Sequence, residues 1–306
     1  MTDAAVPWGL CTTLKAPVDQ VMAFVAHHLS LGCTRMWLFF DDPDDPAAEA
    51  VFDLPRVTVT RCDDAHWRRI KGKRPDKHQN RQGRNMQSVY ANRPLPWIAH
   101  IDVDEFLLPS KDIGTILAGL HRDLAMLPMA PWEALHDPVL PDDIFTANRF
   151  RKALSGDSHA ALRNRVFGPY AHLLPKGVLS HSAGKCFFRT GIPGLEPRLH
   201  GAFLDGMRLP GGSFSPDVAL LHFHAEDPAR WLDRLQFRLT RGAYQFNPSL
   251  AEWLKAADDP AVREFYAQIQ HGTPATLATL RAAGALIEAD LGLRAKVDAL
   301  AGGAFG

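Results

Sequence analysis

The chain has 306 residues, 46% of them hydrophobic, with 34 Lys and Arg against 34 Asp and Glu. This length allows one large or two modest domains with a buried core, and the balanced charge excludes a global field that would recruit nucleic acid or an anionic membrane. Four cysteines without Cys-x-x-Cys spacing favour buried, reduced thiols over a disulfide framework or a zinc site, and therefore a reducing compartment.

Neither a secretory signal in Met1–Pro7 nor an apolar run long enough to cross a bilayer is evident in the sequence. We therefore expect a cytoplasmic protein. Attachment to the inner face of the membrane through a surface helix stays open, because such a helix needs no membrane-spanning length.

Strands and helices alternate in the first part of the chain. Trp8–Leu14 and the apolar run Arg35–Phe40 have strand character, and Pro17–Leu31 between them repeats apolar residues at helical spacing. Asp41 and Asp42 directly follow the second of these strands. In open α/β sheets, ligands bind beyond the carboxyl ends of parallel strands, where these two carboxylates are expected. A solvated acidic turn is the alternative interpretation.

A basic segment follows the next expected strand, Arg56–Arg61. Lysines and arginines recur from Asp63 to Arg84 on an otherwise neutral chain. Such a density is typical of a loop that meets phosphates, and equally of a solvated loop. A helix is predicted over Lys77–Tyr90, and its polar stripe is expected to end near the carboxylates that come next.

The following strand ends in three carboxylates. Trp97–Ile101 has strand character and is mostly apolar, and Asp102, Asp104 and Glu105 follow it within four positions. In an extended backbone, alternation puts Asp102 and Asp104 on the same side. Like charges this close repel each other, so the arrangement predicts a bound cation or a compensating hydrogen-bond network. The alternative is a strand end whose acidic residues cap the next helix.

The middle of the chain has a less regular pattern. An amphipathic helix is predicted over Ile113–Leu127, an irregular proline-rich loop over Pro128–Pro141, and a strand over Ile144–Phe150. Gly184–Arg189 is predicted to be a strand that carries one lysine.

A further apolar run, Val218–Glu226, contains two histidines. Alternation places His222 and His224 on one face of a strand end, where both could reach a metal or a phosphate. For either residue, a core histidine satisfied by backbone groups is the alternative.

The remainder is predicted to be helical. Proline at the start of each segment supports helices over Pro228–Tyr244, Pro260–Gln270 and Pro274–Leu291. No repeat of fixed period or clear linker interrupts the sequence. We therefore expect an α/β fold with a mixed sheet flanked by helices, comprising a domain over residues 1–227 and a helical C-terminal extension over residues 228–306 packed on the same domain.

The order of these features resembles the family 2-like glycosyltransferases of GT-A fold, in particular the subgroup whose acidic motif reads D-x-D-E-F and which is similar to the family 92 enzymes. The resemblance covers Trp8 to Arg234 and is most specific at Trp97–Phe106. Phe24–Gly32 resembles a helix of the family with the pattern W-x-x-Y-H-x-x-x-G. The other matching segments are Trp37–Asp42, Gly184–Lys185, His200 and Leu221–His224.

This resemblance implies an enzyme of the glycosyltransferase class. It would move a sugar, with inversion, from a nucleotide-diphosphate donor to a glycan or a lipid-linked acceptor. A nucleic-acid partner is not expected, because the charges balance. Asp102 and Asp104 match the aspartates that hold Mn²⁺ or Mg²⁺ against the donor diphosphate. His222 is the best match to a histidine that completes the metal shell, and Glu105 is implied to support the site.

The resemblance also implies the contacts to the nucleotide. Asp41 or Asp42 would contact the nucleoside, and Lys185 and Arg84 would contact the phosphates. The sequence departs from the family after the first strand, where Lys15–Pro17 replaces an Asn-Glu pair.

An inverting transfer needs a carboxylate base near the acceptor hydroxyl. Glu133, Asp137 and Glu226 are the candidates by position, and they are not ranked. A Phe-Gly pair of the family is replaced in the loop around Trp132–Asp137, which is expected to shape acceptor choice.

Two other functions remain open. In a metal-dependent phosphoesterase, the same carboxylates with His222 or His224 would activate water. A non-catalytic GT-A-like domain would bind carbohydrate or a partner enzyme and keep the metal for structure alone.

Overall fold

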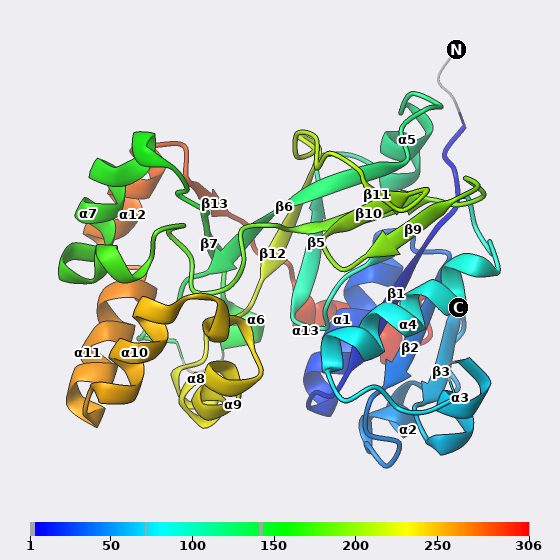
Figure 1. The fold of residues 1–306 in the computed structure, drawn as a ribbon, viewed down its shortest axis with the longest axis horizontal. Helices are drawn as coiled ribbons and strands as arrows, with labels where there is room; N and C mark the ends of the chain where they lie inside the picture. Colours follow the sequence, from blue (N-terminus) through cyan, green and yellow to red (C-terminus); the bar gives the residue numbers. More distant parts are fainter. Residues whose placement is uncertain (1–3, 71, 141–142, 306) are drawn as a thin grey trace. The chain divides into compact units, whose positions relative to one another are not determined.

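The computed structural model describes residues 4–70, 72–140 and 143–305 (Figure 1). Lys71 of the basic segment, Pro141 of the proline-rich loop and the first three residues of the N-terminal segment lie outside the described residues. The chain divides into two compact units. The first unit comprises residues 1–130, 184–220 and 292–306, and the second comprises residues 131–183 and 221–291. The division at residue 227 expected from the sequence remains a prediction.

The first unit is built on a mixed sheet whose central strands are parallel. Its strands are β1 (Trp8–Leu14), β2 (Arg35–Phe40), β3 (Val57–Arg61), β4 (Trp97–His100), β5 (Glu105–Pro109) and β8 (Lys185–Arg189). β1 pairs in parallel with β2 and β4, β2 pairs in parallel with β3, and β8 is antiparallel to β4. In register, Leu14 lies opposite Phe40 and Cys11 opposite His100. The residues that follow β1, β2 and β4 therefore emerge at one edge of the sheet.

A small second sheet also belongs to the first unit. Its antiparallel strands are β9 (Leu195–Arg198), β10 (Gly201–Leu204) and β11 (Met207–Arg208). The helices of this unit are α1 (Val18–Ser30), α2 (Ala47–Val51), α3 (Asp64–Ile70), α4 (His78–Ala91), α5 (Ile113–Ala118) and α13 (Leu293–Ala301). Helix α1 packs against α13, and α4 packs against both β1 and β9 (Figure 1).

Helix α4 is fixed on the sheet by its apolar side. Met86, Val89 and Tyr90 have the spacing of one helical face and are buried in a cluster that includes Ile98 and Phe188 of the sheet. Burial of each large apolar side chain stabilises the packing by about 1.5–3 kcal/mol. The polar residues of α4 are consequently held in a defined orientation.

The second unit combines a short antiparallel sheet with helices. Strand β6 (Met126–Ala134) contains the boundary at residue 130, and its end pairs with β7 (Arg149–Lys152), which pairs with β13 (Leu286–Glu288). Strand β12 (Val218–His222) contains the boundary at residue 220. The helices are α6 (Asp143–Thr146), α7 (Ala160–Phe167), α8 (Pro228–Asp233), α9 (Leu235–Thr240), α10 (Pro248–Ala256), α11 (Asp259–Gln270) and α12 (Pro274–Ala282), with short 3-10 helices at Asp157–His159, Gly168–Leu173 and Ala243–Phe246.

Two expectations for the middle of the chain are wrong. The helix predicted over Ile113–Leu127 ends at Ala118, and the residues expected to be an irregular loop from Pro128 continue strand β6 to Ala134. Pairing of Met126–Met129 with β8 explains the change, because it buries Met126 and Leu127 and outweighs their helical spacing.

Three further segments are more divided than predicted. The strand expected over Ile144–Phe150 is helix α6 up to Thr146 and strand β7 from Arg149. The helix expected over Pro228–Tyr244 breaks into α8 and α9 at Arg234. The helix expected over Pro274–Leu291 stops after α12, because Gly284 adopts a left-handed φ of 62° before β13 begins.

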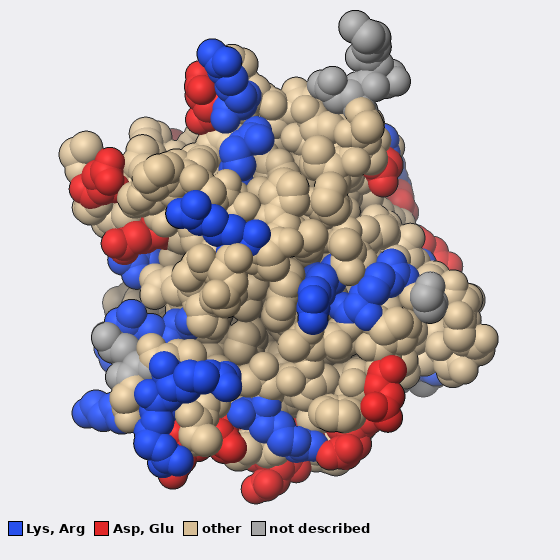
Figure 2. Space-filling view, turned by 90° about the vertical axis from the view of Figure 1, so that its right-hand side faces the viewer, with Lys and Arg blue, Asp and Glu red and all other residues tan. Residues whose placement is uncertain are grey.

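The expected fold class, a mixed α/β sheet flanked by helices with a helical C-terminal part, is confirmed. All four cysteines are buried and form no disulfide, as their spacing predicted. Within the described residues, no helix combines the length and the apolar character that crossing a membrane requires. On the face shown in Figure 2, basic side chains lie among acidic and neutral ones, and neither charge covers that face.

Candidate functional site

Several of the predicted carboxylates meet at one edge of the first unit's sheet. Asp41 and Asp42 follow β2, and Asp102 comes soon after β4. The Asp41 N–H donates to the Leu14 carbonyl at the end of β1, at 2.9 Å. Parallel pairing of these strands therefore brings the acidic residues together, as predicted from their positions.

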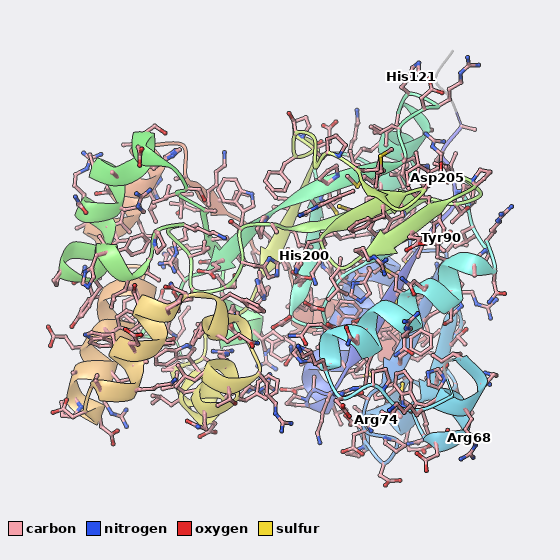
Figure 3. All side chains as sticks on the ribbon, in the orientation of Figure 1. Arg68, Arg74, Tyr90, His121, His200 and Asp205 are labelled. Carbon is pink, nitrogen blue, oxygen red and sulfur yellow. The ribbon has the colours of Figure 1, made fainter. Side chains whose placement is uncertain are left out.

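Asp41 is held by two arginines. Arg81 of α4 donates to both carboxylate oxygens, at 2.6 and 2.8 Å, and the side chains are only 13% and 19% exposed. Arg74, on the segment between α3 and α4 (Figure 3), lies 3.0 Å from the same carboxylate. This fork-shaped pairing fixes the basic segment to the end of β2. The basic segment is therefore held against the sheet through Arg74 and Arg81.

Asp42 has a partner from the segment that departs from the family pattern. Lys15 donates to its carboxylate at 2.9 Å, and the pair is exposed. The hydrogen bond and the charge of Lys15 lower the pKa of Asp42. The sequence offered no signal for this pair other than the position of Lys15 just after β1.

The acidic motif forms a turn, which corrects the extended backbone assumed for Asp102 and Asp104. The Glu105 N–H donates to the Asp102 carbonyl at 3.0 Å, which closes a four-residue turn. The Asp102 N–H in return donates to the buried Glu105 carboxylate at 2.7 Å. Val103 and Asp104 occupy the middle of the turn, so strand alternation does not apply to them. The supporting role expected of Glu105 requires a contact of this kind, and that role remains a prediction.

Asp102 sits between an amide and an ammonium group. Gln82 of α4 and Lys185 of β8 each donate to one of its carboxylate oxygens, both at 2.7 Å. The Lys185 side chain is 2% exposed, and its ammonium is also 3.6 Å from Glu105. Burial alone would lower the pKa of Lys185, but the charges of Asp102 and Glu105 outweigh burial and raise it. Lys185 therefore supplies a permanent positive charge.

His100 interacts electrostatically with Lys185 and Asp102 and was missed by sequence reasoning. It is buried, and within the described part of the chain neither of its ring nitrogens has a hydrogen-bond partner. Burial, with the nearby charge of Lys185, lowers its pKa to about 3. His100 is therefore neutral, and the positive charge beside Asp102 belongs to Lys185. Its position two residues before Asp102 was the available signal.

The donor groups at this turn fit a hard divalent cation. Asp102 and Asp104 offer carboxylate oxygens, which Mg²⁺ and Mn²⁺ prefer. Both residues are partly exposed, so a cation could approach them from solvent. A cation there would share Asp102 with Lys185.

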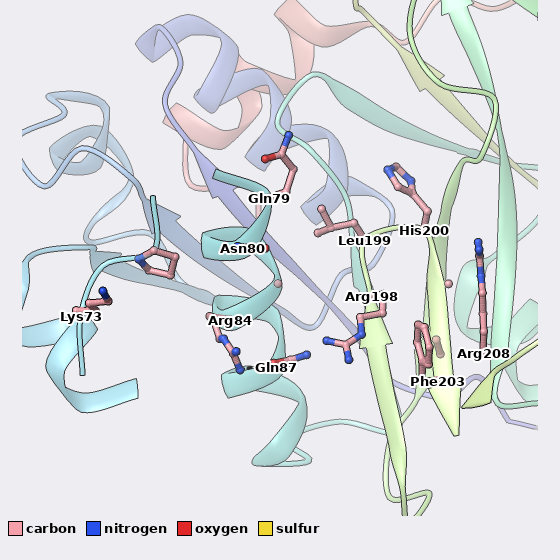
Figure 4. Close-up of a pocket in the computed structure, with 14 residues that line it drawn as sticks. Lys73, Gln79, Asn80, Arg84, Gln87, Arg198, Leu199, His200, Phe203 and Arg208 are labelled. Carbon is pink, nitrogen blue, oxygen red and sulfur yellow. Dashed lines mark hydrogen bonds between the residues drawn. The ribbon is translucent and has the colours of Figure 1, made fainter. Parts of the chain in front are cut away.

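Arg84 is not among the residues described as contacting Asp102. It lines a neighbouring groove. The groove, about 620 Å³ in volume, lies between α4 and the sheet β9–β11 (Figure 4). We call it the basic groove, since its lining includes Lys73, Arg84, Arg198, His200 and Arg208. His200, a residue of the resemblance, shares a 2.7 Å hydrogen bond between its Nδ1 and the Gly184 carbonyl, next to Lys185.

Glu133, a candidate base, is part of a buried network in the second unit. Its carboxylate accepts from Arg151 at 2.9 Å and from the backbone N–H groups of Leu179 and Ser180 at 3.0 and 2.6 Å. Burial would raise its pKa, but Arg151 and these hydrogen bonds outweigh burial and lower it. These contacts are typical of a structural ion pair, and the role of Glu133 as a base remains a prediction.

The other candidates of the second unit have different surroundings. Asp137 is 24% exposed at its side chain and pairs with Arg149 at 2.9 Å, whereas Glu226 is buried. His222 is buried at the end of β12, with its ring centroid 5.5 Å from that of His181 and 5.2 Å from that of His224. The roles of Asp137 and Glu226 as bases, and of His222 as a metal ligand, remain predictions. His181 was not singled out in the sequence.

Comparisons with known proteins give limited information. No family model and no curated protein matches the chain. The crystal structure of S. aureus TarS 1-349 is similar at a TM-score of 0.35 and 9% identity, covering 97% of this chain and 92% of that chain. The structure of CMP:2-keto-3-deoxy-manno-octonic acid synthetase complexed with CTP is similar at a TM-score of 0.28 and 12% identity, covering 92% and 88%. Scores of this size assign neither a fold family nor a function.

Proposed function

We propose that the protein is a metal-dependent glycosyltransferase of GT-A type that uses a nucleotide-diphosphate sugar as its donor. The observation that carries the proposal is the Asp102 turn, held by Gln82 and Lys185 at the carboxyl edge of the parallel strands. Phosphate chemistry needs fixed positive charge next to carboxylates that can hold a cation, and this edge supplies both. The motif resemblance at Trp97–Phe106 supports the same assignment.

In this proposal, each residue at the edge has a separate task. Asp102 and Asp104 hold Mn²⁺ or Mg²⁺, which when bound neutralises charge developing on the leaving diphosphate. Lys185 adds a second positive charge that does not depend on pH in the physiological range, because its pKa is raised. The Asp41–Arg81 pair keeps α4 in place, so that Gln82 continues to orient Asp102. The Asp42–Lys15 pair flanks the expected nucleoside position.

Nucleotide-binding calorimetry tests the proposal. UDP, GDP, CDP and ADP are titrated with Mn²⁺ and with EDTA, and at least one should bind only when the metal is present. Asp102→Asn and Asp104→Asn should each weaken this binding at least tenfold, which corresponds to about 1.4 kcal/mol. Asp123→Asn is the matched control, since Asp123 is 76% exposed and does not lie at this edge. Equal binding with EDTA, or unchanged binding in both variants, would refute the metal assignment.

A product assay separates the proposal from a phosphoesterase. Incubation of the matching nucleotide-sugar with Mn²⁺ should release free sugar and nucleoside diphosphate through slow hydrolysis. Release of inorganic phosphate or of a sugar phosphate would instead indicate phosphoester chemistry. A domain that only binds carbohydrate would release none of these products.

A further inference from the structure

The basic groove has a lining that the proposed donor site does not explain. Its cations are Lys73 and Arg84 on one side and Arg198 and Arg208 on the other, and no Asp or Glu is among the residues described as lining it. Arg84, Arg198 and Arg208 come from α4, β9 and β11, so the charge is assembled by folding. On a chain whose charges balance overall, this concentration marks a place for an anion.

One face of α4 is dedicated to the groove. Asn80, Gly83, Arg84 and Gln87 follow the spacing of a single helical stripe, and all four line the groove (Figure 4). The amide side chains of Asn80 and Gln87 can both donate and accept hydrogen bonds, as sugar hydroxyls do. The groove therefore offers charge and hydrogen bonding along the same stripe.

Gly83 is a separate indication that the groove receives a ligand. Glycine inside a helix costs about 1 kcal/mol relative to alanine. A Cβ built at Gly83 would meet no atom within 4 Å, so packing does not require glycine there. Because Gly83 lines the groove, its missing side chain leaves room for a ligand to approach the helix backbone.

The aromatic content of the groove argues against nucleic acid. Phe203 is the single Phe, Tyr or Trp among the residues described as lining it, and the Arg198 guanidinium lies over its ring, 5.2 Å from the centroid. A single such ring, already covered by an arginine, is a poor platform for a run of stacked bases. The Arg198–Glu196 pair, with side chains 48% and 53% exposed, is a weak surface pair that an anionic ligand can replace.

The groove adjoins the proposed diphosphate site through two elements. Helix α4 directs Gln82 to Asp102 and the stripe from Asn80 to Gln87 to the groove. His200, which lines the groove, bonds to Gly184, and the next residue, Lys185, binds Asp102. A chain lying in the groove would therefore have one end beside the site of transfer.

We infer that the basic groove binds the acceptor of the transfer, and that this acceptor is a glycan carrying phosphate or carboxylate groups. The acceptor role rests on the proposed function, whereas binding of an anionic glycan does not. Phosphate and carboxylate share the chemistry that arginine recognises, and separate probes distinguish them.

Calorimetry without a donor tests the inference on the intact chain. The probes are phosphomannan fragments, oligogalacturonate, neutral maltoheptaose and an oligothymidylate. At least one anionic glycan should bind at least tenfold more tightly than maltoheptaose, and rising salt should weaken that binding. Equal affinity for maltoheptaose, or tighter binding of oligothymidylate, overturns the inference.

Matched variants locate the binding. Arg198→Gln with Arg208→Gln should weaken anionic glycan binding about tenfold for each guanidinium removed, as expected for charge-assisted hydrogen bonds. The corresponding double lysine variant should bind more tightly than the glutamine variant and more weakly than the wild type, because lysine keeps the charge and loses the forked hydrogen bonding. Arg122→Gln is the control, because Arg122 is 91% exposed and does not line the groove. An equal loss in this control overturns the location.

Gly83→Leu separates a binding role from a structural one. The Cβ has open space and leucine is a better helix former, so the thermal midpoint should stay or rise. Anionic glycan binding should nevertheless fall, because the side chain fills the groove; unchanged binding overturns the inference.

Failure of wild-type nucleoside diphosphate binding, with glycan binding intact, would refute the proposed function and leave the groove assignment standing.

Discussion

Removal of the Lys185 ammonium should destabilise the first unit strongly. In Lys185→Met, Glu105, which is 0% exposed, and Asp102, which is 28% exposed, lose the cation that lies 3.6 and 2.7 Å from them. Breaking a buried ion pair by removing one partner costs about 3–5 kcal/mol. Asp102 keeps Gln82 and some contact with water, so we expect a loss near the lower limit, about 3 kcal/mol.

A second substitution should partly reverse this loss. Glu105→Gln lowers stability in the wild-type chain, because it removes a partner of Lys185. In the Lys185→Met background it removes an uncompensated buried charge, so it should raise stability by about 1–2 kcal/mol. This change of sign is the outcome that distinguishes an ion-paired site from a merely well-packed one.

Urea unfolding at neutral pH measures all four chains of this cycle, and hydrogen exchange at the amides of β4 and β8 assigns the change to the first unit. Lys111→Met is the control, since Lys111 is 56% exposed and lies 3.9 Å from Asp217, and it should cost less than about 0.5 kcal/mol. The reasoning is wrong if Glu105→Gln lowers stability equally in both backgrounds.

Three further predictions concern stability. Asp41→Asn breaks the forked pair with Arg81 and should cost about 2 kcal/mol, with faster amide exchange at the start of α4 as the readout. The folded pKa of Glu133 lies below its ordinary value of 4.5, because Arg151 and the hydrogen bonds to the carboxylate together outweigh burial. The stabilisation by Glu133 is therefore present above that pH and lost as the pH falls, and acid titration of Glu133→Gln should show a weaker dependence of stability on pH. Burial lowers the pKa of His27 from its ordinary value of 6.5 to about 3. As the pH falls between these values, the unfolded chain binds a proton at His27 and the folded chain does not, so stability is lost. His27→Gln should reduce this loss by about 1.4 kcal/mol per pH unit.

The positions of the central strands followed from the sequence, because their signal is local. Mostly apolar runs at Trp8–Leu14, Arg35–Phe40 and Trp97–Ile101 are each followed by a charged residue, and the structure places strands there. Parallel pairing then gathers the residues after them at one edge. Asp41 and Asp102 could be expected together on this ground alone.

The contacts of these carboxylates could not be derived in the same way. Two arginines of α4 lie three positions apart, yet Arg81 binds Asp41 while Arg84 lines the groove. Only the rotation of the helix, set by burial of Met86 and Val89, decides between them. The turn at Asp102 likewise depends on two hydrogen bonds with Glu105 that no periodicity reveals. The strands β9–β11 are too short for alternation to identify them.

Helix α4 has an unusual consequence for how much sequence change the protein can accept. An ordinary amphipathic helix has one constrained face and one that tolerates substitution. In α4, one stripe is buried in the core, a second binds Asp41 and Asp102, and a third, from Asn80 to Gln87, lines the groove. A saturation scan of this helix should therefore find few neutral positions around its whole circumference, a profile expected of a core helix although much of α4 is accessible to water.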